Sequence, residues 1–408
     1  MRLTSHRGAL LALVALACGV ACQALKPHPP PARPAERADV ANVARGDRAF
    51  ALELFGALRS RSGNFAFSPA SVRMVLTMAW AGSAGQTAGE LGEELGLAGD
   101  PTAIHQSNQT LLGAWTKPNA GAASFRLRLA QGFFAQVERQ AAQSFIELLQ
   151  RHYAAPFSPK DFAAPEVARE QINHWVDKRT EGRIEEMLPP GSLDSGLELV
   201  LVSAVDFQAP WKEPFRLDHT APGKFERPGA KPVSAALMTR VGTHGVNETP
   251  EAQLVELELG GGDYVFDLIV PKGELAAFEA TLDERKLDAL LSGVAPKRST
   301  VTLPRFVAGE TEDLAAAVQK TGVHAAFTPG KADFSPITGT TKLHLSRLLH
   351  RVSLRVDEGA SAEGSGKGKA PEAEGVAVRA TRPFLYLVRD ARRNMILCFG
   401  RLSEPPPP

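Results

Sequence analysis

Residues 358–375, EGASAEGSGKGKAPEAEG, place the strongest constraint on the fold, because no uncharged side chain in this segment is larger than proline. Two apolar runs flank it, RVSLRV at residues 351–356 and PFLYLV at residues 383–388, and both have the composition of strands. Segments of this composition are typical of linkers between domains. This one lies inside what the rest of the sequence indicates to be one domain, so the fold must carry a long polar loop between two strands.

The bulk composition is that of an ordinary globular protein. The chain has 408 residues, of which 44% are hydrophobic and 22% charged. Its formal net charge of +1, without a long run of one sign, argues against a protein that binds nucleic acid through bulk electrostatics. Two of the three cysteines lie near the N-terminus, and Cys398, in the apolar run MILCFG, is expected to be a buried small hydrophobe. A disulfide framework is therefore excluded, and the fold depends on its core.

Residues 1–22 predict an export signal. A basic start precedes an apolar segment, residues 8–22, that is too short and too rich in small residues for a membrane span. Its cysteines follow small residues and resemble the lipidated cysteine of bacterial lipoprotein signals. Cys22 is favoured over Cys18 because it leaves a longer apolar core, and simple secretion is the alternative. With a Pro-rich tether at residues 23–42, we expect an exported protein, either an envelope lipoprotein held to the membrane by its lipid or an extracellular protein.

Residues 43–404 predict a single domain in which helices lead and strands follow. Apolar residues at helical spacing indicate helices over residues 43–60, 68–83, 86–97 and 165–184. Alternating or continuous apolar runs indicate strands over residues 197–211, 252–259, 263–271 and 299–306, and a final hairpin around residues 389–394. The predicted fold class is therefore α+β, with mostly antiparallel or mixed sheets.

Motifs of catalysis and of metal binding do not occur in the sequence. It has no G-x-S-x-G, H-E-x-x-H or C-x-x-C, and its histidines are scattered. The run EGSGKGKA superficially resembles a phosphate-binding loop, but Lys369 is followed by Ala370 and Pro371 rather than by Ser or Thr and a helix. We therefore expect no enzymatic activity, no metal and no other cofactor.

Several separated stretches are similar to one family, in the right order and spacing. They are NFAFSPASVRMVLTMAWAGSAGQTAGEL (64–91), INHWVDKRTEGRIEEML (172–188), LVSAVDFQAPWKEPF (201–215), VTLPRF (301–306), KADFSPI (331–337), HRVSLRVDEG (350–359) and RPFLYLVRDARRNMILCFGRL (382–402). On these motifs the chain resembles the serpins. The resemblance implies the serpin fold, with large mixed or antiparallel sheets, N-terminal helices and an exposed reactive-centre loop at residues 358–382.

In serpins a target protease cleaves this loop and forms an acyl-enzyme, and the loop then inserts as a new strand into the large sheet. An inserting strand alternates faces, so the side chains that point inward must be small. One face of the segment carries Ala360, Ala362, Gly364, Gly366 and Gly368, and the other carries Ser361, Glu363, Ser365, Lys367 and Lys369. This alternation favours insertion, with a flexible linker that happens to alternate as the alternative. By resemblance, the hinge consists of Glu358, Gly359, Ala360, Ser361, Ala362, Glu363 and Gly364.

The resemblance places the cleaved bond by two counts that differ by one residue. Counting forward from Gly359 gives Ala373, and counting back from Pro383 gives Glu372. The reactive bond is therefore Glu372–Ala373 or Ala373–Glu374. Alanine before the bond would suit an elastase-like or subtilisin-like protease, and glutamate would suit a glutamyl endopeptidase.

The resemblance also implies residues that control the opening of the sheet. The shutter and breach positions are Ser68, Ser71, Ser203, Trp211 and His350. Ser203 and Gln131 stand where the family usually has asparagine, and the alternative for Ser68 is a simple helix cap. Asp357 or Glu358 is expected to form a surface ion pair with Arg305, worth less than about 1 kcal/mol.

We expect a monomeric inhibitor of a serine protease, or alternatively of a cysteine protease, that binds no nucleic acid. The main alternative is a non-inhibitory serpin whose loop is only a substrate. Each glycine in the loop weakens a strand by roughly 0.5–1 kcal/mol relative to alanine, which favours that alternative.

Overall fold

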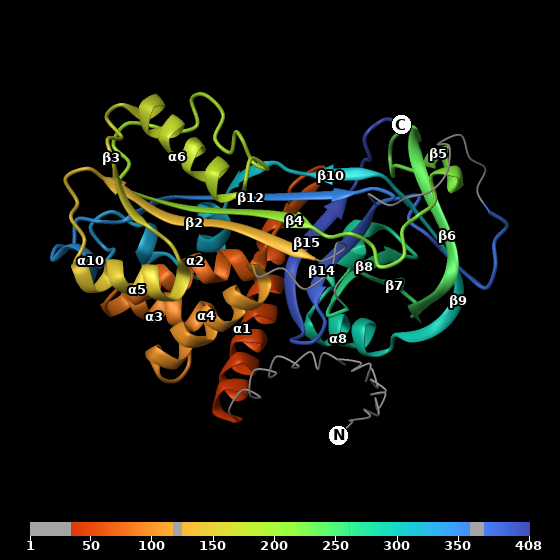
Figure 1. The fold of residues 1–408 in the computed structure, drawn as a ribbon, viewed down its shortest axis with the longest axis horizontal. Coiled ribbons are helices and arrows are strands. Elements are labelled where there is room, and N and C mark those ends of the chain that lie inside the picture. The colour runs from red at the N-terminus through yellow and green to blue at the C-terminus, as the bar shows by residue number, and fades with distance from the viewer. Residues whose placement is uncertain (1–33, 117–124, 261, 360–370) are drawn as a thin grey trace, which may run out of the picture.

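The computed structural model describes residues 34–116, 125–260, 262–359 and 371–408, arranged as in Figure 1. Its helices are α1 (Pro34–Leu58), α2 (Pro69–Ala81), α3 (Gly85–Glu94), α4 (Pro101–Thr116), α5 (Gln143–Tyr153), α6 (Pro165–Arg179), α7 (Leu275–Ala280), α8 (Glu284–Ser292), α9 (Ala315–Lys320) and α10 (Ser335–Thr338). The predicted helical regions are therefore confirmed, and α1 begins earlier than expected, inside the segment for which a tether is predicted.

Local signals explain where α2 begins and where α6 ends. Ser68 caps α2, because its side chain accepts a hydrogen bond from the backbone N–H of Ser71, and Pro69 supplies a preset φ in the first turn. α6 stops at Arg179 because Glu181 and Gly182 adopt φ of 55° and 74°, and glycine tolerates this left-handed backbone. The chain therefore turns back toward the sheet directly after α6.

A six-stranded sheet in the described part of the chain runs in the order β10-β12-β4-β2-β3, with β11 also paired to β12. The strands are β2 (Arg126–Gln136), β3 (Phe157–Lys160), β4 (Leu199–Gln208), β10 (Phe306–Ala308), β11 (Thr311–Asp313) and β12 (Leu345–Val356). β12 and β4 are parallel neighbours from Leu345↔Leu199 to Leu354↔Phe207. In contrast, β2 pairs antiparallel with the other side of β4.

The second sheet has nine strands among the described residues, in the order β1-β15-β14-β8-β7-β6-β9-β13, with β5 paired to β6. They are β1 (Phe65–Phe67), β5 (Thr220–Phe225), β6 (Val233–Glu248), β7 (Ala252–Glu258), β8 (Tyr264–Pro271), β9 (Ala295–Pro304), β13 (Val376–Arg379), β14 (Phe384–Asp390) and β15 (Met395–Leu402). β14 and β15 form the predicted hairpin. β13 pairs parallel with β9 and forms the edge of the sheet opposite β1.

Helices cover both faces of the six-stranded sheet (Figure 1). On one face α2 is buried along nearly its whole length in the main hydrophobic core. On the other face α6 packs through Ile172 and Val176 against a second buried cluster that includes Val200 and Val202 of β4. The sheet is thus enclosed on both faces, so a strand that enters it must fit between packed layers.

The structure contradicts one detailed expectation from the sequence and confirms another. The single strand expected at residues 299–306 is wrong, because the chain changes sheets there: β9 ends at Pro304 and β10 begins at Phe306. Arg305 lies at this junction, and the ring of Pro304 removes a backbone donor that a continuous strand would use. The prediction for Cys398 is confirmed, because its thiol is free and buried.

We predict that Gly400→Ala destabilises the fold. A Cβ atom at Gly400 would lie 2.1 Å from Cζ of the buried Tyr386 ring on the paired strand. Overpacking of this kind typically costs about 1–3 kcal/mol, so the urea midpoint of unfolding should fall. Gly89→Ala in α3 is the control, since nothing lies within 4 Å of its new Cβ and alanine favours a helix. Equal midpoints for the two variants would contradict the prediction.

Candidate functional site

The candidate site is the boundary between β12 and β4, together with the loop that leaves β12. The loop follows β12 directly, so a segment folding back beside β12 would run antiparallel to it. Since β12 and β4 are parallel, such a segment would also be antiparallel to β4. One parallel ladder would become two antiparallel ladders, which are slightly more stable per residue.

A buried hydrogen-bond network crosses the middle of this boundary. His350 of β12 and Ser203 of β4 are register partners, and His350 Nδ1 lies 2.7 Å from the Ser203 carbonyl oxygen. Ser203 Oγ lies 2.8 Å from Ser71 Oγ of α2, and Gln131 Nε2 of β2 donates to Ser71 Oγ at 2.8 Å. The backbone N–H of Ser68 donates to His350 Nε2 at 2.9 Å. The structure therefore brings together Ser68, Ser71, Ser203 and His350, and adds Gln131.

The protonation of His350 follows from its partners. Since Nε2 accepts a hydrogen bond from a backbone N–H, the proton must sit on Nδ1, which donates to Ser203. The imidazole is completely buried, and this burial lowers its pKa to about 4, against the smaller opposing effect of the hydrogen bond to Ser203. The ring is therefore neutral at physiological pH and holds β12 to β4 as a directional donor.

A second polar connection, the Arg128–Asp206–Ser353 bridge, crosses the boundary nearer the end of β12. Ser353 Oγ of β12 donates to Asp206 Oδ1 of β4 at 2.9 Å, and Arg128 Nη1 of β2 lies 3.1 Å from Asp206 Oδ2. Arg128 also donates to Glu181 at 2.8 Å. Arg128 and Asp206 are both buried, so their charges are compensated within this cluster. Three strands are thereby joined by side chains as well as by backbone.

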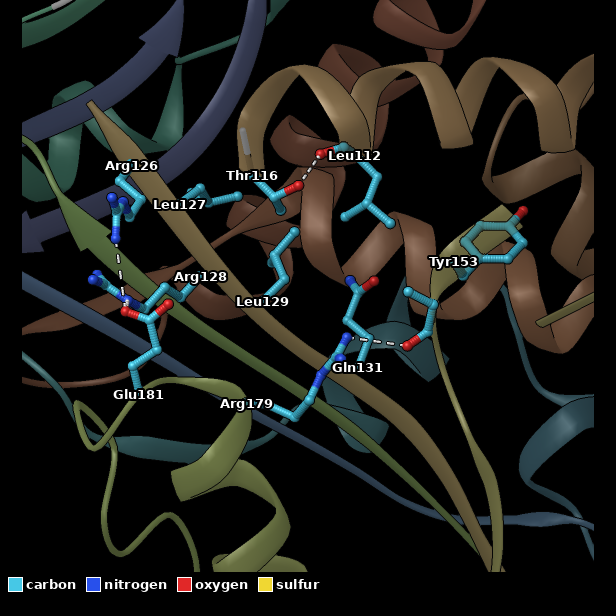
Figure 2. A pocket seen from close by; sticks show the side chains of 11 residues that line it. Leu112, Thr116, Arg126, Leu127, Arg128, Leu129, Gln131, Tyr153, Arg179 and Glu181 are labelled. Atoms are coloured by element: carbon cyan, nitrogen blue, oxygen red, sulfur yellow. Dashed lines mark hydrogen bonds and ion pairs between the residues drawn. The ribbon is translucent and has the colours of Figure 1, made fainter. Parts of the chain in front are cut away.

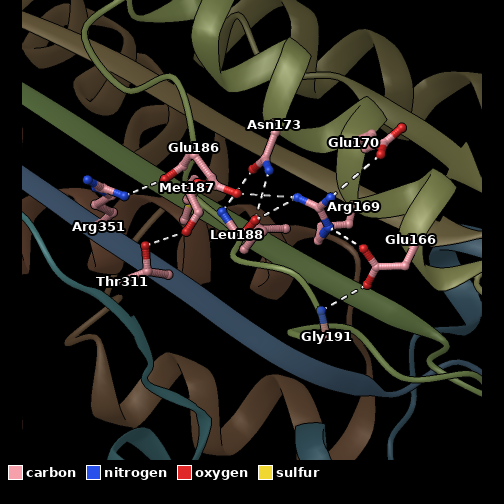
Figure 3. Close-up of polar contacts among 10 residues, drawn as sticks. All are labelled: Glu166, Arg169, Glu170, Asn173, Glu186, Met187, Leu188, Gly191, Thr311 and Arg351. Atoms are coloured by element: carbon pink, nitrogen blue, oxygen red, sulfur yellow. Dashed lines mark hydrogen bonds and ion pairs between the residues drawn. The ribbon is translucent and has the colours of Figure 1, made fainter.

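The segment after α6 lies across the same boundary (Figure 3). Asn173 of α6 exchanges two hydrogen bonds of 2.8 Å with the backbone of Leu188. Arg351 of β12 donates to the carbonyl oxygen of Glu186. This segment therefore ties α6 to β12, and it must shift if β12 separates from β4.

The end of β12 is held by buried contacts. Trp211 Nε1 donates to the carbonyl oxygen of Asp357 at 2.6 Å. Glu358 pairs with Arg305, and Arg305 Nε lies 2.8 Å from both of its carboxylate oxygens. The expectation of a surface ion pair is wrong in one respect, because Glu358 is only 4% exposed. The carboxylate of Asp357 instead accepts a hydrogen bond from the backbone N–H of Gly359, which has a φ of 96°.

The candidate reactive residues Glu372, Ala373 and Glu374 are exposed. Glu374 is docked on β9, because its backbone N–H donates to Thr300 Oγ1 at 2.7 Å and its carbonyl oxygen accepts from the same hydroxyl at 2.9 Å. Arg298 also pairs with the Glu374 carboxylate. The chain is therefore anchored to the nine-stranded sheet from Glu374 onward.

Other predicted residues fall outside the described part of the chain. These are the hinge residues Ala360, Ser361, Ala362, Glu363 and Gly364, and the predicted lipidation site Cys22. Among the described residues, no group of three or more His, Cys, Asp or Glu is arranged to hold a metal ion. None of the described helices is long and apolar enough to cross a membrane.

Sequence reasoning did not find the Arg128–Asp206–Ser353 bridge. The available signal was weak: Asp206 is a single charged residue within the apolar run LVLVSAVDFQ, and Arg128 lies in a segment that was not predicted as a strand. A buried charge in a strand requires a partner. The identity of the partner depends on the register of β2, β4 and β12, which the sequence alone does not supply.

Comparison with known proteins decides the family. The family model described as Serpin (serine protease inhibitor) matches residues 45–405. The chain belongs to the serpin family. Human serpin B9 is 32% identical to this serpin over 358 residues, which cover 84% of this chain and 94% of the relative. A leukocyte elastase inhibitor of Xenopus tropicalis is 28% identical over 376 residues, which cover 87% of this chain and 97% of the relative.

Solved structures confirm the predicted serpin fold. The structure of mouse protein-Z dependent protease inhibitor superposes with a TM-score of 0.82 at 20% identity, over 91% of this chain and 99% of that chain. Uncleaved ovalbumin superposes with a TM-score of 0.80 at 22% identity, over 89% of this chain and 100% of that chain. The resemblance stated from the sequence motifs is thus confirmed for both family and fold.

We predict that Ser353→Ala weakens the closed β12–β4 boundary. The change removes one neutral donor to a carboxylate, worth about 1.5–3 kcal/mol, so separation of the strands should become at least about tenfold faster. The rate is measured as annealing of a synthetic peptide with the sequence of residues 359–372, followed by the rise in thermal stability. Ser158→Ala is the control, because Ser158 Oγ lies on β3 and contacts Lys160. Equal annealing rates in the two variants would contradict the role of the bridge.

A second prediction concerns pH. Because burial lowers the pKa of His350 from 6.5 to about 4, the unfolded chain binds a proton more readily than the folded chain between these values. Its contribution to stability is present above pH 6.5 and is lost as the pH falls toward 4. His105 and His244 act in the same direction, whereas the raised pKa of Asp47, about 7, acts in the opposite one.

The variant His350→Asn isolates this effect. Between pH 7 and pH 5, the decrease in the folded-to-unfolded ratio of the wild type should exceed that of the variant by on the order of tenfold. The measurement is urea unfolding at both pH values. An unchanged pH dependence in the variant would show that His350 does not titrate in this way.

Proposed function

We propose that this serpin inhibits a serine protease by suicide cleavage of its reactive-centre loop and insertion of that loop between β12 and β4. A cysteine protease is the alternative target class. The observation that carries the proposal is the closed parallel boundary of β12 and β4, from whose end the loop departs. The protein acts as an inhibitor and not as a hydrolase.

The energetics favour insertion. A strand that enters between β12 and β4 gains backbone hydrogen bonds on both sides, and its small residues suit the packed face of the sheet. The network of His350 and the Arg128–Asp206–Ser353 bridge oppose entry, because each must break first. The native protein would therefore be trapped kinetically above a more stable inserted form.

The target class depends on which bond is cleaved. Cleavage of Ala373–Glu374 would require the protease to engage Glu374, which is docked on Thr300. Cleavage of Glu372–Ala373 leaves one further residue between the bond and this docked position. An elastase-like or subtilisin-like enzyme matches the first bond and a glutamyl endopeptidase the second. The leukocyte elastase inhibitors among the relatives support inclusion of an elastase in the test.

A non-inhibitory serpin is the second candidate function. The glycines of residues 358–375 favour it, because each lowers the strand propensity of the loop. In that case the loop would be cleaved without insertion.

We also propose that the protein is exported and monomeric, as a lipoprotein anchored through Cys22 or as a secreted protein.

The test mixes the chain from Lys26 onward with elastase-, subtilisin-, trypsin- and glutamyl-type proteases. We expect at least one protease to form an adduct that survives denaturing electrophoresis, and we expect the denaturant to free a C-terminal fragment that begins at Ala373 or Glu374 by mass spectrometry. Cleavage by every protease without an adduct, and without a rise in thermal stability, would instead establish the non-inhibitory function.

A matched pair of loop variants separates insertion from recognition. Ala362→Arg places a large charged side chain at a position whose side chain would point into the sheet, so the adduct should disappear while cleavage persists. Glu363→Arg places the same side chain on the solvent face and should retain the adduct. If both variants retain the adduct, insertion of this segment is not required for trapping.

A further inference from the structure

A cavity of about 420 Å³ lies between the end of α2, the helix α3, the start of α4 and the C-terminal half of α5. Its volume falls within the range of small-molecule sites, about 300–1,000 Å³. None of the described strands contributes to its walls, so the cavity is separate from the boundary of β12 and β4. Its lining is mainly apolar and consists of Trp80, Ala81, Ser83, Ala88, Pro101, Thr102, His105, Leu148 and His152.

The charge around the cavity favours an uncharged ligand. Among the described residues that line it, no Asp, Glu, Lys or Arg occurs. Asp100 precedes α4, and its carboxylate accepts hydrogen bonds from the backbone N–H groups of Thr102 at 3.2 Å and Ala103 at 3.3 Å. The N-terminus of α4 is therefore already capped by a negative group, which would repel an anion at this rim of the cavity.

Tyr153 determines which nitrogen of His105 carries the hydrogen. His105 Nδ1 lies 2.6 Å from Tyr153 Oη, and Asn108 Nδ2 donates to the same oxygen at 3.4 Å. Tyr153 is only 2% exposed, and Figure 2 shows its hydroxyl directed away from Gln131 and from the pocket along β2. Among the described residues, His105 Nδ1 is the only acceptor for this hydroxyl. The hydrogen of the neutral ring therefore sits on Nε2, which becomes a donor at the cavity.

His152 has the opposite polarity. Its Nδ1 lies 3.1 Å from Gln109 Oε1, which can only accept, so Nδ1 carries the hydrogen and Nε2 presents a lone pair. Burial lowers the pKa of both imidazoles, to about 4 for His105, so both rings are neutral at physiological pH.

The two rings place a donor beside an acceptor. Their centroids are 5.9 Å apart, and in the described part of the chain neither Nε2 atom has a hydrogen-bond partner. Trp80 adds an aromatic surface next to them, since its ring centroid lies 5.9 Å from that of His105. A mainly apolar cavity with a few convergent polar groups is the usual form of a small-molecule site.

We propose that this cavity binds an uncharged aromatic lactam, a cyclic amide joined to an aromatic ring. The amide of a small ring is cis, so its C=O and N–H lie on the same edge and match a neighbouring donor and acceptor. The carbonyl oxygen accepts from His105 Nε2, the amide N–H donates to His152 Nε2, and the aromatic ring packs on Trp80. A metal ion fits less well, because it would need a lone pair on His105 Nε2. This binding goes beyond protease inhibition and does not depend on it.

The binding test compares carbostyril with coumarin on the uncleaved chain from Lys26 onward. The two bicyclic molecules have the same shape, but coumarin has a ring oxygen where carbostyril has the amide N–H. Calorimetry should show binding of carbostyril, and coumarin should bind about tenfold more weakly because His152 loses its donor. Failure of carbostyril to bind at millimolar concentration overturns the proposal, and equal affinity of the two overturns the pairing with His152.

A histidine variant assigns the acceptor. His152→Phe keeps a ring of similar size but removes the lone pair, so the ratio of carbostyril to coumarin affinity should fall from about ten to about one. His174→Phe on α6 is the control and should keep the ratio, since His174 is exposed and does not line the cavity. The ratio is taken within one variant, so a general change in stability cancels. An unchanged ratio in His152→Phe overturns the assignment.

A second pair of variants locates the ligand. Ala88→Phe on α3 fills the cavity, so it should weaken binding of both molecules at least about tenfold. Gln86→Phe on the same helix is the control, because Gln86 is exposed and lies outside the lining. Equal affinity in the two variants overturns the location.

The position of the ring hydrogens has its own readout. Nitrogen-15 spectra of histidine-labelled protein distinguish a protonated ring nitrogen from one with a lone pair. His105 Nε2 should be protonated and His152 Nε2 should not, and both signals should shift when carbostyril is added. A hydrogen on His105 Nδ1 overturns its role as the donor. Adduct formation with proteases is measured separately, so failure of the lactam proposal is distinguishable from failure of the inhibitory function.

Discussion

The parallel contact of β12 with β4 is the interaction on which the rest of this structure depends. The two strands pair in parallel, whereas a strand inserted between them would pair antiparallel with each. Antiparallel pairing is slightly more stable per residue, so the closed sheet does not have the most stable backbone hydrogen bonding that its strands could form. The side chains across the boundary are buried and polar, and each lost contact leaves a group without a partner. The barrier to opening therefore comes from a few directional contacts, while the gain after opening comes from the backbone of a whole strand.

Under the proposed insertion, these contacts separate the part of the sheet that stays in place from the part that moves. Ser71 belongs to α2, which is buried in the main core, whereas His350 belongs to the strand that must separate. Ser203 of β4 lies between them and contacts both side chains. The segment after α6 adds a contact on the opposite face through Arg351. Opening therefore requires coordinated changes on both faces of one sheet.

Much of this arrangement was predictable from the sequence, and what was missed has physical causes. The helices α1, α2, α3 and α6, the C-terminal hairpin and the cap at Ser68 follow from periodicity and local chemistry, which short segments encode, whereas α4 and α5 were not predicted. β2 was missed although RLRL at its start alternates between charged and apolar residues, because the buried residues that follow, AQGFFA, do not continue the alternation. The burial of Glu358 and the partners of Asp206 depend on strand register across the sheet, which no local pattern specifies.

The docking of Glu374 on β9 decides what happens to the polypeptide once it is cut. The strands that follow the cut are all paired within the nine-stranded sheet. β13 pairs with β9, β14 lies between β8 and β15, and β15 also pairs with β1. The cleaved molecule would thus consist of two polypeptides in one folded domain. Strand pairing alone would retain its short C-terminal polypeptide. Under the proposed mechanism, a protease attached to the other new end would be carried by a body whose nine-stranded sheet keeps all of its strands.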